Sequence, residues 1–191
     1  KQLHDKTKKS IKKRSVDVMV NEMMELYDVE DRRHPKFKIY TIDPEESKDF
    51  DDAYSIYYNE NTSQYHLSIY ISNVTIWLDY LELWDSFTKR VSTIYLPDRR
   101  IPMLPTILSE DLCSLVEKES RFALALDIIV DGKTGKIITN SFHNVCIKVK
   151  KNSRYDDIDY IDKSYYIKVL ECVRTMNTCC SYLKLIHDSH D

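Results

Sequence analysis

Four aspartates occur within ten residues, at positions 43–52, directly after an apolar segment at 37–42. They are Asp43, Asp49, Asp51 and Asp52. Carboxylates held close together raise one another's pKa unless a cation neutralises them. A hard divalent ion with oxygen ligands, Mg²⁺ or Mn²⁺, is the economical explanation. The alternative is a solvated acidic loop. The apolar run at 53–58 favours a site, because it fixes the loop between two buried elements.

The spacing of the four aspartates fits no single regular element. In a strand, Asp49 and Asp51 share one face and Asp52 lies on the other. In a helix, Asp49 and Asp52 align and Asp51 does not. Asp43 lies roughly 20 Å from Asp49 if the chain between them is extended, so the segment must fold back for the carboxylates to meet. The proline and serine between these two aspartates are typical of such an irregular loop.

Two other acidic motifs do not match this stretch. An EF-hand calcium loop needs a central Gly and a Glu at its twelfth position. Here there is no Gly, and the twelfth residue counted from Asp43 is Tyr54. A dehalogenase-type nucleophile would follow directly on a hydrophobic run, whereas Lys48 precedes Asp49. Neither a calcium loop nor such a nucleophile is predicted.

Three sequence blocks occur in a fixed order along the chain. Residues 41–53 read TIDPEESKDFDDA, residues 90–97 read RVSTIYLP, and residues 101–115 contain IPMLP followed by LSEDLCSL. Together they resemble the signatures of the ribonuclease II (RNB-domain) exoribonucleases, relatives of the exosome's catalytic subunit. The resemblance extends from about Asp31 to Ile186. It corresponds to about the first half of a full-length RNB domain.

The resemblance implies an activity and a site. It implies processive, Mg²⁺-dependent 3′-to-5′ hydrolysis of single-stranded RNA that releases nucleoside 5′-monophosphates. Asp43, Asp49 and Asp52 match positions that hold metal directly or through water. Asp51 matches the carboxylate most closely tied to the catalytic metal and the attacking water. Asp51 and Asp52 are therefore the candidate catalytic residues within a metal site of four aspartates.

Metal ions explain how such a site would act on RNA. One ion lowers the pKa of a bound water, and a second, about 4 Å away, stabilises the leaving 3′ oxygen. Bound divalent ions also reverse the negative field of the carboxylates, so that anionic RNA can approach.

Three further residues are candidate RNA contacts. Tyr95 matches the family position that stacks on the terminal base at the 3′ end. An aromatic face grips any base without reading sequence, and this stacking contributes roughly 1–3 kcal/mol per base. Arg99 and Arg100 follow closely and are candidates for phosphate contacts. The alternatives are an ordinary strand tyrosine, in a chain with 14 tyrosines, and a solvated loop for the two arginines.

The sequence departs from the family pattern in three ways. Asn73 and Trp84 stand where the family usually has aspartates. The family's later segment, with a catalytic arginine, would lie beyond Asp191, as would the oligonucleotide-binding barrels expected in a full-length protein. One hypothesis is therefore that the chain is the metal-binding half of an exoribonuclease. A second is a non-catalytic RNA-binding or structural remnant, and a third is a divalent-metal hydrolase that acts on another substrate.

Composition sets broader limits. The chain has 191 residues with 42% hydrophobic content, which is enough for one globular core. A net charge of -3 does not by itself indicate nucleic-acid binding. No long uncharged apolar run occurs, so neither a signal peptide nor a membrane span is expected. Five cysteines without a CxxC pair favour reduced thiols and a cytoplasmic location, with the nucleus as an alternative.

The elements that must position the site follow from hydrophobic spacing. Helices are expected at 16–27, 76–90 and 164–186, and strands at 37–42, 53–58, 65–71, 122–130 and 136–149. The predicted fold class is α+β, with a mixed, largely antiparallel sheet and flanking helices. The expected domains are a basic N-terminal arm with a linker helix at 1–30 and the N-terminal part of an RNB catalytic domain at 31–191. The arm is interpreted as solvated, with an RNA contact as the alternative.

Overall fold

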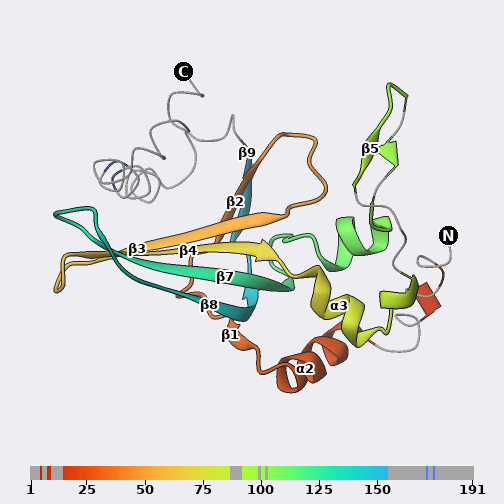
Figure 1. Cartoon of the computed structure of the whole chain (residues 1–191), viewed down its shortest axis with the longest axis horizontal. Coiled ribbons are helices and arrows are strands. Elements are labelled where there is room, and N and C mark those ends of the chain that lie inside the picture. The colour runs from red at the N-terminus through yellow and green to blue at the C-terminus, as the bar shows by residue number, and fades with distance from the viewer. Residues whose placement is uncertain are drawn as a thin grey trace.

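The computed structural model describes residues 5, 8, 9, 15–86, 92–98, 100, 101, 103–154, 171 and 174. Its centre is a seven-stranded sheet in the order β1-β8-β7-β4-β3-β2-β9 (Figure 1). The strands of this sheet are β1 (Glu30–Arg32), β2 (Tyr40–Asp43), β3 (Asp52–Asn59), β4 (Gln64–Ser72), β7 (Ser120–Asp131), β8 (Ile137–Lys148) and β9 (Lys151–Arg154). A separate two-stranded sheet pairs β5 (Ile94–Tyr95) with β6 (Arg100–Ile101).

The large sheet is mixed and mainly antiparallel. The five strands from β8 to β2 are antiparallel to their neighbours, whereas β1 pairs in parallel with β8 and β9 in parallel with β2. Short turns join β3 to β4 and β7 to β8. The two turns are in contact, because the Gly132 N–H donates to the Ser63 carbonyl at 2.8 Å. A Cβ at Gly132 would lie 2.7 Å from that oxygen, so glycine is required there. The predicted α+β fold class is confirmed.

Two helices cover one end of the sheet (Figure 1). Helix α2 (Val16–Leu26) and helix α3 (Val74–Tyr80) share one core cluster with residues of β7 and β8. Met23 of α2, Trp77 of α3 and Phe122 of β7 are almost completely buried in it. Trp77 and Phe122 pack edge to face, with ring centroids 5.9 Å apart. The helix predicted at 16–27 is therefore confirmed, and its methionines belong to the core.

The helix predicted at 76–90 is wrong in its extent. Helix α3 ends at Tyr80, and Glu82 has a φ of 52°, which is left-handed backbone that cannot continue a helix. A short 3₁₀ turn, η1 (Trp84–Ser86), follows, and residues 87–90 lie outside the described residues. Trp84, in this turn, is 48% exposed, and its indole N–H donates to Asp79.

Several predictions fall where the structure is not described. The helix expected at 164–186, apart from residues 171 and 174, lies outside the described residues, as does most of the basic arm at 1–14. The division into domains at residue 30 stays a prediction. Of the five cysteines, Cys113 and Cys146 are described, and both are free and buried. Burial raises the pKa of the Cys113 thiol to about 12. None of the described helices is long and apolar enough to cross a membrane.

Candidate functional site: an acidic loop at the end of β2

The pairing of β2 with β3 brings two of the aspartates to the same end of the two strands. The register pairs Tyr40 with Tyr54 in antiparallel strands. Strand β2 ends at Asp43 and β3 begins at Asp52, so both residues lie at the same end of this antiparallel pair. The predicted strand at 37–42 begins later, at Tyr40, and ends at Asp43, so Asp43 belongs to the strand and not to the loop. Residues 44–51 form the loop that connects β2 to β3, and this loop carries Asp49 and Asp51.

The backbone of this loop is fixed by a segment that is distant in sequence. The Phe50 N–H donates to the Ser114 hydroxyl oxygen at 3.0 Å, and that hydroxyl donates to the Lys48 carbonyl at 3.1 Å. The Leu115 N–H donates to the Phe50 carbonyl at 2.9 Å. One serine therefore holds the chain on both sides of Asp49, which the sequence alone left as an unconstrained turn.

Asp51 is held from the opposite side of the loop. The Ser72 N–H, at the end of β4, donates to the Asp51 carbonyl at 2.8 Å. The Ser72 hydroxyl donates to the Cys113 carbonyl at 2.5 Å, so β4 and the segment at 113–115 are also joined to each other. The backbone around Asp49 and Asp51 is consequently part of the sheet framework.

Buried polar side chains support this framework. Ser114 is completely buried, and its carbonyl accepts from Arg121 Nε at 2.8 Å. The Asn152 amide, from β9, donates to the Leu115 carbonyl and to the Thr41 hydroxyl, both at 2.9 Å. Thr41 is itself completely buried in β2. Strands β2, β7 and β9 and the Leu-Cys-Ser-Leu segment at 112–115 are thus joined by one connected hydrogen-bond network. This network supports the loop that carries the aspartates.

The four carboxylates interact electrostatically. Burial raises the pKa of Asp43, a hydrogen bond with the Thr41 side chain opposes this, and the charges of Asp52, Asp51 and Asp49 raise the pKa further. Asp43 Oδ2 is buried, and no group among the described residues hydrogen-bonds to it. A buried carboxylate oxygen without a partner is costly, and a bound cation would remove that cost.

The carboxylates do not meet at one point. Asp43 and Asp49 are half-buried, whereas Asp51 and Asp52 are exposed. Across the described ranges, no three His, Cys, Asp or Glu side chains are arranged so that they could hold one metal ion. The structure therefore brings the four aspartates into electrostatic range of one another but does not join them at a shared centre.

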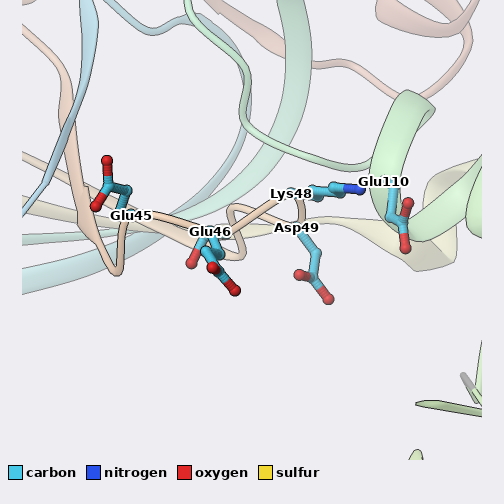
Figure 2. A pocket seen from close by; sticks show the side chains of 6 residues that line it. Glu45, Glu46, Lys48, Asp49 and Glu110 are labelled. Atoms are coloured by element: carbon cyan, nitrogen blue, oxygen red, sulfur yellow. The ribbon is translucent and has the colours of Figure 1, made fainter. Parts of the chain in front are cut away.

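An open cavity of about 630 Å³ lies beside the loop. It is lined by Glu45, Glu46, Ser47, Lys48, Asp49 and Glu110. Figure 2 shows Lys48 extending toward Glu110, with Glu46 and Asp49 pointing to a common side. Glu110 comes from the π-helix η2 (Ile107–Leu112). Of the four aspartates, all of which are described, Asp49 lines this cavity.

Two of the three candidate RNA contacts, Tyr95 and Arg100, belong to the small β5–β6 sheet, which stands away from the large sheet (Figure 1). Tyr95 is 76% exposed and pairs with Arg100 across the two strands. Tyr95 does not line the acidic cavity. Arg99 lies outside the described residues, and for Arg100 the structure gives the backbone alone. Their roles stay predictions.

Asn73, which replaces a family aspartate, has a defined structural role. It is the N-cap of α3, and its Oδ1 accepts from the Thr75 hydroxyl at 2.6 Å and from the Ile76 N–H at 3.4 Å. Its Nδ2 donates to Asn144 Oδ1 in β8 at 3.2 Å. Asparagine caps helices as well as aspartate does, so this departure preserves the element next to the loop.

Sequence reasoning missed the supporting residues Ser114, Arg121 and Asn152. Ser114 lies inside the Leu-Cys-Ser-Leu motif, and a polar residue within such an apolar run was the available signal. Arg121 and Asn152 gave no signal, because each donates to a backbone carbonyl of the 114–115 segment whose position the sequence does not reveal.

Comparison with known proteins places this arrangement in a family. The model of the RNB domain matches residues 30–179. Ribonuclease R of Ureaplasma parvum serovar 3 is 36% identical over 124 residues, which cover 64% of this chain and 17% of that protein. Exoribonuclease 2 of Vibrio vulnificus is 39% identical over 122 residues, which cover 62% of this chain and 18% of that protein.

Solved structures share the fold. Mycoplasma genitalium RNase R in complex with double-stranded RNA has a TM-score of 0.64 and 27% identity, covering 80% of this chain and 28% of that one. Yeast Ssd1, described as a pseudonuclease, has a TM-score of 0.66 at 19% identity, covering 79% of this chain and 19% of that one, which shows the fold alone. Although the chain spans a fifth or less of the length of the curated relatives it matches, the family match covers most of its own residues. The chain belongs to the RNB domain family.

Proposed function

We propose that this chain is the metal-binding half of a hydrolytic 3′-to-5′ exoribonuclease that acts on single-stranded RNA and releases 5′-mononucleotides. The observation that carries this proposal is the electrostatic coupling of Asp43 to Asp49, Asp51 and Asp52 on a backbone fixed by hydrogen bonds. Relatives named ribonuclease R and exoribonuclease 2 support the reaction class.

The donor set fits a hard divalent cation. All four candidate ligands offer carboxylate oxygens, which Mg²⁺ and Mn²⁺ prefer, and Asp43 supplies a buried oxygen without a protein partner. Asp43, Asp49, Asp51 and Asp52 would hold the ion or ions, directly or through water. Bound divalent ions would lower the pKa of a coordinated water and offset the charge of the phosphate.

The chain's own residues have separate tasks in this proposal. The exposed carboxylate of Asp51 accepts a hydrogen bond from the attacking water, while Ser72 keeps its backbone in place. The carboxylate of Asp52 would help to neutralise the positive charge of the divalent ion or ions. The exposed ring of Tyr95 stacks on the base at the 3′ end. Arg99 and Arg100 contact phosphates of the same RNA strand.

The remaining parts would come from other segments. The rest of the RNB domain, with the catalytic arginine that the family resemblance implies, and oligonucleotide-binding barrels would complete the RNA channel. The two free, buried cysteines suit a reducing compartment, and we place the protein in the cytoplasm or the nucleus. The chain itself would not contact a membrane.

A non-catalytic remnant that binds RNA or serves a structural role is the second candidate. The observation that favours it is the absence of a converged metal-ligand group among the described residues. A remnant would bind RNA, or stabilise a partner, without hydrolysis.

The test uses the polypeptide continued past Asp191 to the end of its reading frame. With Mg²⁺ we expect it to shorten labelled single-stranded RNA from the 3′ end and to release mononucleotides. Asp51→Asn is expected to abolish this release while leaving the fold intact by circular dichroism. Equal degradation by both proteins would reject the role of Asp51. No degradation by the unaltered protein, with RNA still bound, would favour the remnant.

A further inference from the structure

A second pocket, of opposite charge to the acidic loop, lies at the start of β2. It has a volume of about 450 Å³, and the charged side chains that line it are all cations. They are Arg33, Lys38, Lys118, Lys148 and Lys150. Pro35 and Phe37 add apolar surface to the same pocket.

The pocket is lined by five cations, and none of the described residues that line it is acidic. Arg33 pairs with Asp31 at 2.7 Å, and Lys118 pairs with Glu117 at 3.2 Å. Lys150 instead donates to the neutral hydroxyl of Tyr40 at 3.1 Å. In a chain whose formal net charge is -3, such a local excess of cations marks a surface for an anionic ligand.

The strands β2 and β9 connect this pocket to the acidic loop. The Lys150 N–H donates to the Ile39 carbonyl, just before β2 begins. At the other end of the same strand pair, Asp43 is in register with Arg154. The four residue steps from Ile39 to Asp43 span roughly 13 Å of strand. The cations and the aspartates thus lie a few nucleotides apart on one framework.

We propose that this basic pocket binds the phosphate backbone of single-stranded RNA on the 5′ side of the nucleotide held at the acidic loop. The inference rests on the proposed function for the position of the RNA's 3′ end. Lysines beside an aromatic ring and a proline suit a strand that offers both phosphates and apolar base faces. The strands that form this pocket also lead to the acidic loop, which favours RNA over an acidic polypeptide, and the polypeptide is an outcome of the test.

The test measures RNA affinity of the 191-residue chain against salt concentration, in EDTA, by fluorescence anisotropy of a labelled oligouridine. Each phosphate contact contributes about 0.7 to the slope of log affinity against log salt for a single strand. Lys148→Gln combined with Lys150→Gln should therefore flatten the slope by about 1.4. The matched control, Lys133→Gln with Lys136→Gln in the β7–β8 turn, should leave the slope unchanged, because both lysines are exposed and remote from the pocket. If the double variant misfolds, the exposed Lys148→Gln alone should flatten the slope by about 0.7.

An unchanged slope in the pocket variant, or an equal loss in the control, would overturn the proposal. Polyglutamate that displaces the RNA at matched charge would overturn the assignment to RNA. Because binding is measured without metal, the slope does not depend on hydrolysis. If the longer polypeptide lacks nuclease activity but the pocket variant flattens the slope, the proposed function is contradicted and the pocket proposal stands. If the slope of the pocket variant is unchanged while hydrolysis is intact, the pocket proposal fails and the proposed function stands.

Discussion

Ser114 shows how one buried side chain can position an acidic site. Its hydroxyl accepts from the Phe50 N–H and donates to the Lys48 carbonyl, so it bonds to the chain on both sides of Asp49. An alanine there would leave a partly buried N–H and a partly buried carbonyl without their partners. Unsatisfied buried groups cost about 1–3 kcal/mol each.

We therefore expect Ser114→Ala to lower the free energy of unfolding by about 2 kcal/mol. It should also weaken Mg²⁺ binding, because the loop that carries Asp49 loses its anchor. Urea denaturation and metal titration measure the two effects. Ser141→Ala, at an exposed serine of β8, is the control and should change neither. Full metal affinity in folded Ser114→Ala would show that the loop does not depend on this serine.

At the residue scale, the sequence predicted the aspartates but not what holds them. Four carboxylates in ten residues are visible without a structure, since their mutual repulsion needs an explanation. The contacts of Ser114 and Asn152 join segments more than thirty-five residues apart. These two contacts are made to backbone groups, and nothing in the identity of the residues that carry them reveals the pairing.

At the scale of elements, strand register places the acidic residues. Because β2 and β3 are antiparallel, the end of β2 at Asp43 and the start of β3 at Asp52 lie at the same end of the strand pair, although eight residues separate them along the chain. Hydrophobic spacing predicted both strands, but the end of β2 was misjudged because Asp43 is polar. The helix at 76–90 was overextended, since left-handed backbone at a glutamate leaves no trace in hydrophobic spacing.

The cap of α3 gives a prediction about the departure from the family. Asn73→Ala should lower the free energy of unfolding by about 1 kcal/mol, because Asn73 Oδ1 no longer accepts from the first turn of the helix. Asn73→Asp should stay close to the unaltered chain, since both residues cap helices well. Thermal denaturation of the three proteins compares them. Equal loss in both variants would mean that the amide contact with Asn144 matters more than the cap.

Arg32 and Asp127 link three strands of the sheet through hydrogen bonds. From β1 it makes two hydrogen bonds to Asp127 of β7, at 2.8 and 2.6 Å, and Ser68 of β4 donates to the same carboxylate. Burial alone would raise the pKa of Asp127, but the hydrogen bonds from Arg32 and Ser68 hold that pKa below its usual range. These hydrogen bonds between strands are therefore strongest when Asp127 is charged.

Asp127→Asn should cost about 3 kcal/mol near neutral pH, because it leaves the buried guanidinium with Glu30 as its remaining carboxylate partner. A depressed folded-state pKa gives stability above about pH 3.9 that is lost as the pH falls through the folded value. The difference between the two proteins should therefore shrink in acid. Denaturation at several pH values measures it, with the exposed Glu60→Gln as control. A difference that stayed constant down to acid would show that the charge of Asp127 is not responsible.

At the scale of the whole molecule, the chain is a framework with charge separated along β2 and β9. A basic pocket lies where these strands begin, and the acidic loop lies where they end. Composition gave no hint of this, because a net charge of -3 averages the two regions. Fold class and family were predictable, since both follow from strand patterning and motif order. The arrangement of charge depends on register and needed the structure.

The central claim is that the four aspartates act together as ligands of a divalent cation. Isothermal titration of the chain with Mn²⁺, and competition by Mg²⁺, measures this directly. We expect the unaltered chain and Glu60→Gln to bind alike, and Asp43→Asn and Asp51→Asn each to lose at least about tenfold in affinity, or about 1.4 kcal/mol. Equal Mn²⁺ affinity in all four proteins, or no binding by the unaltered chain, would contradict the account.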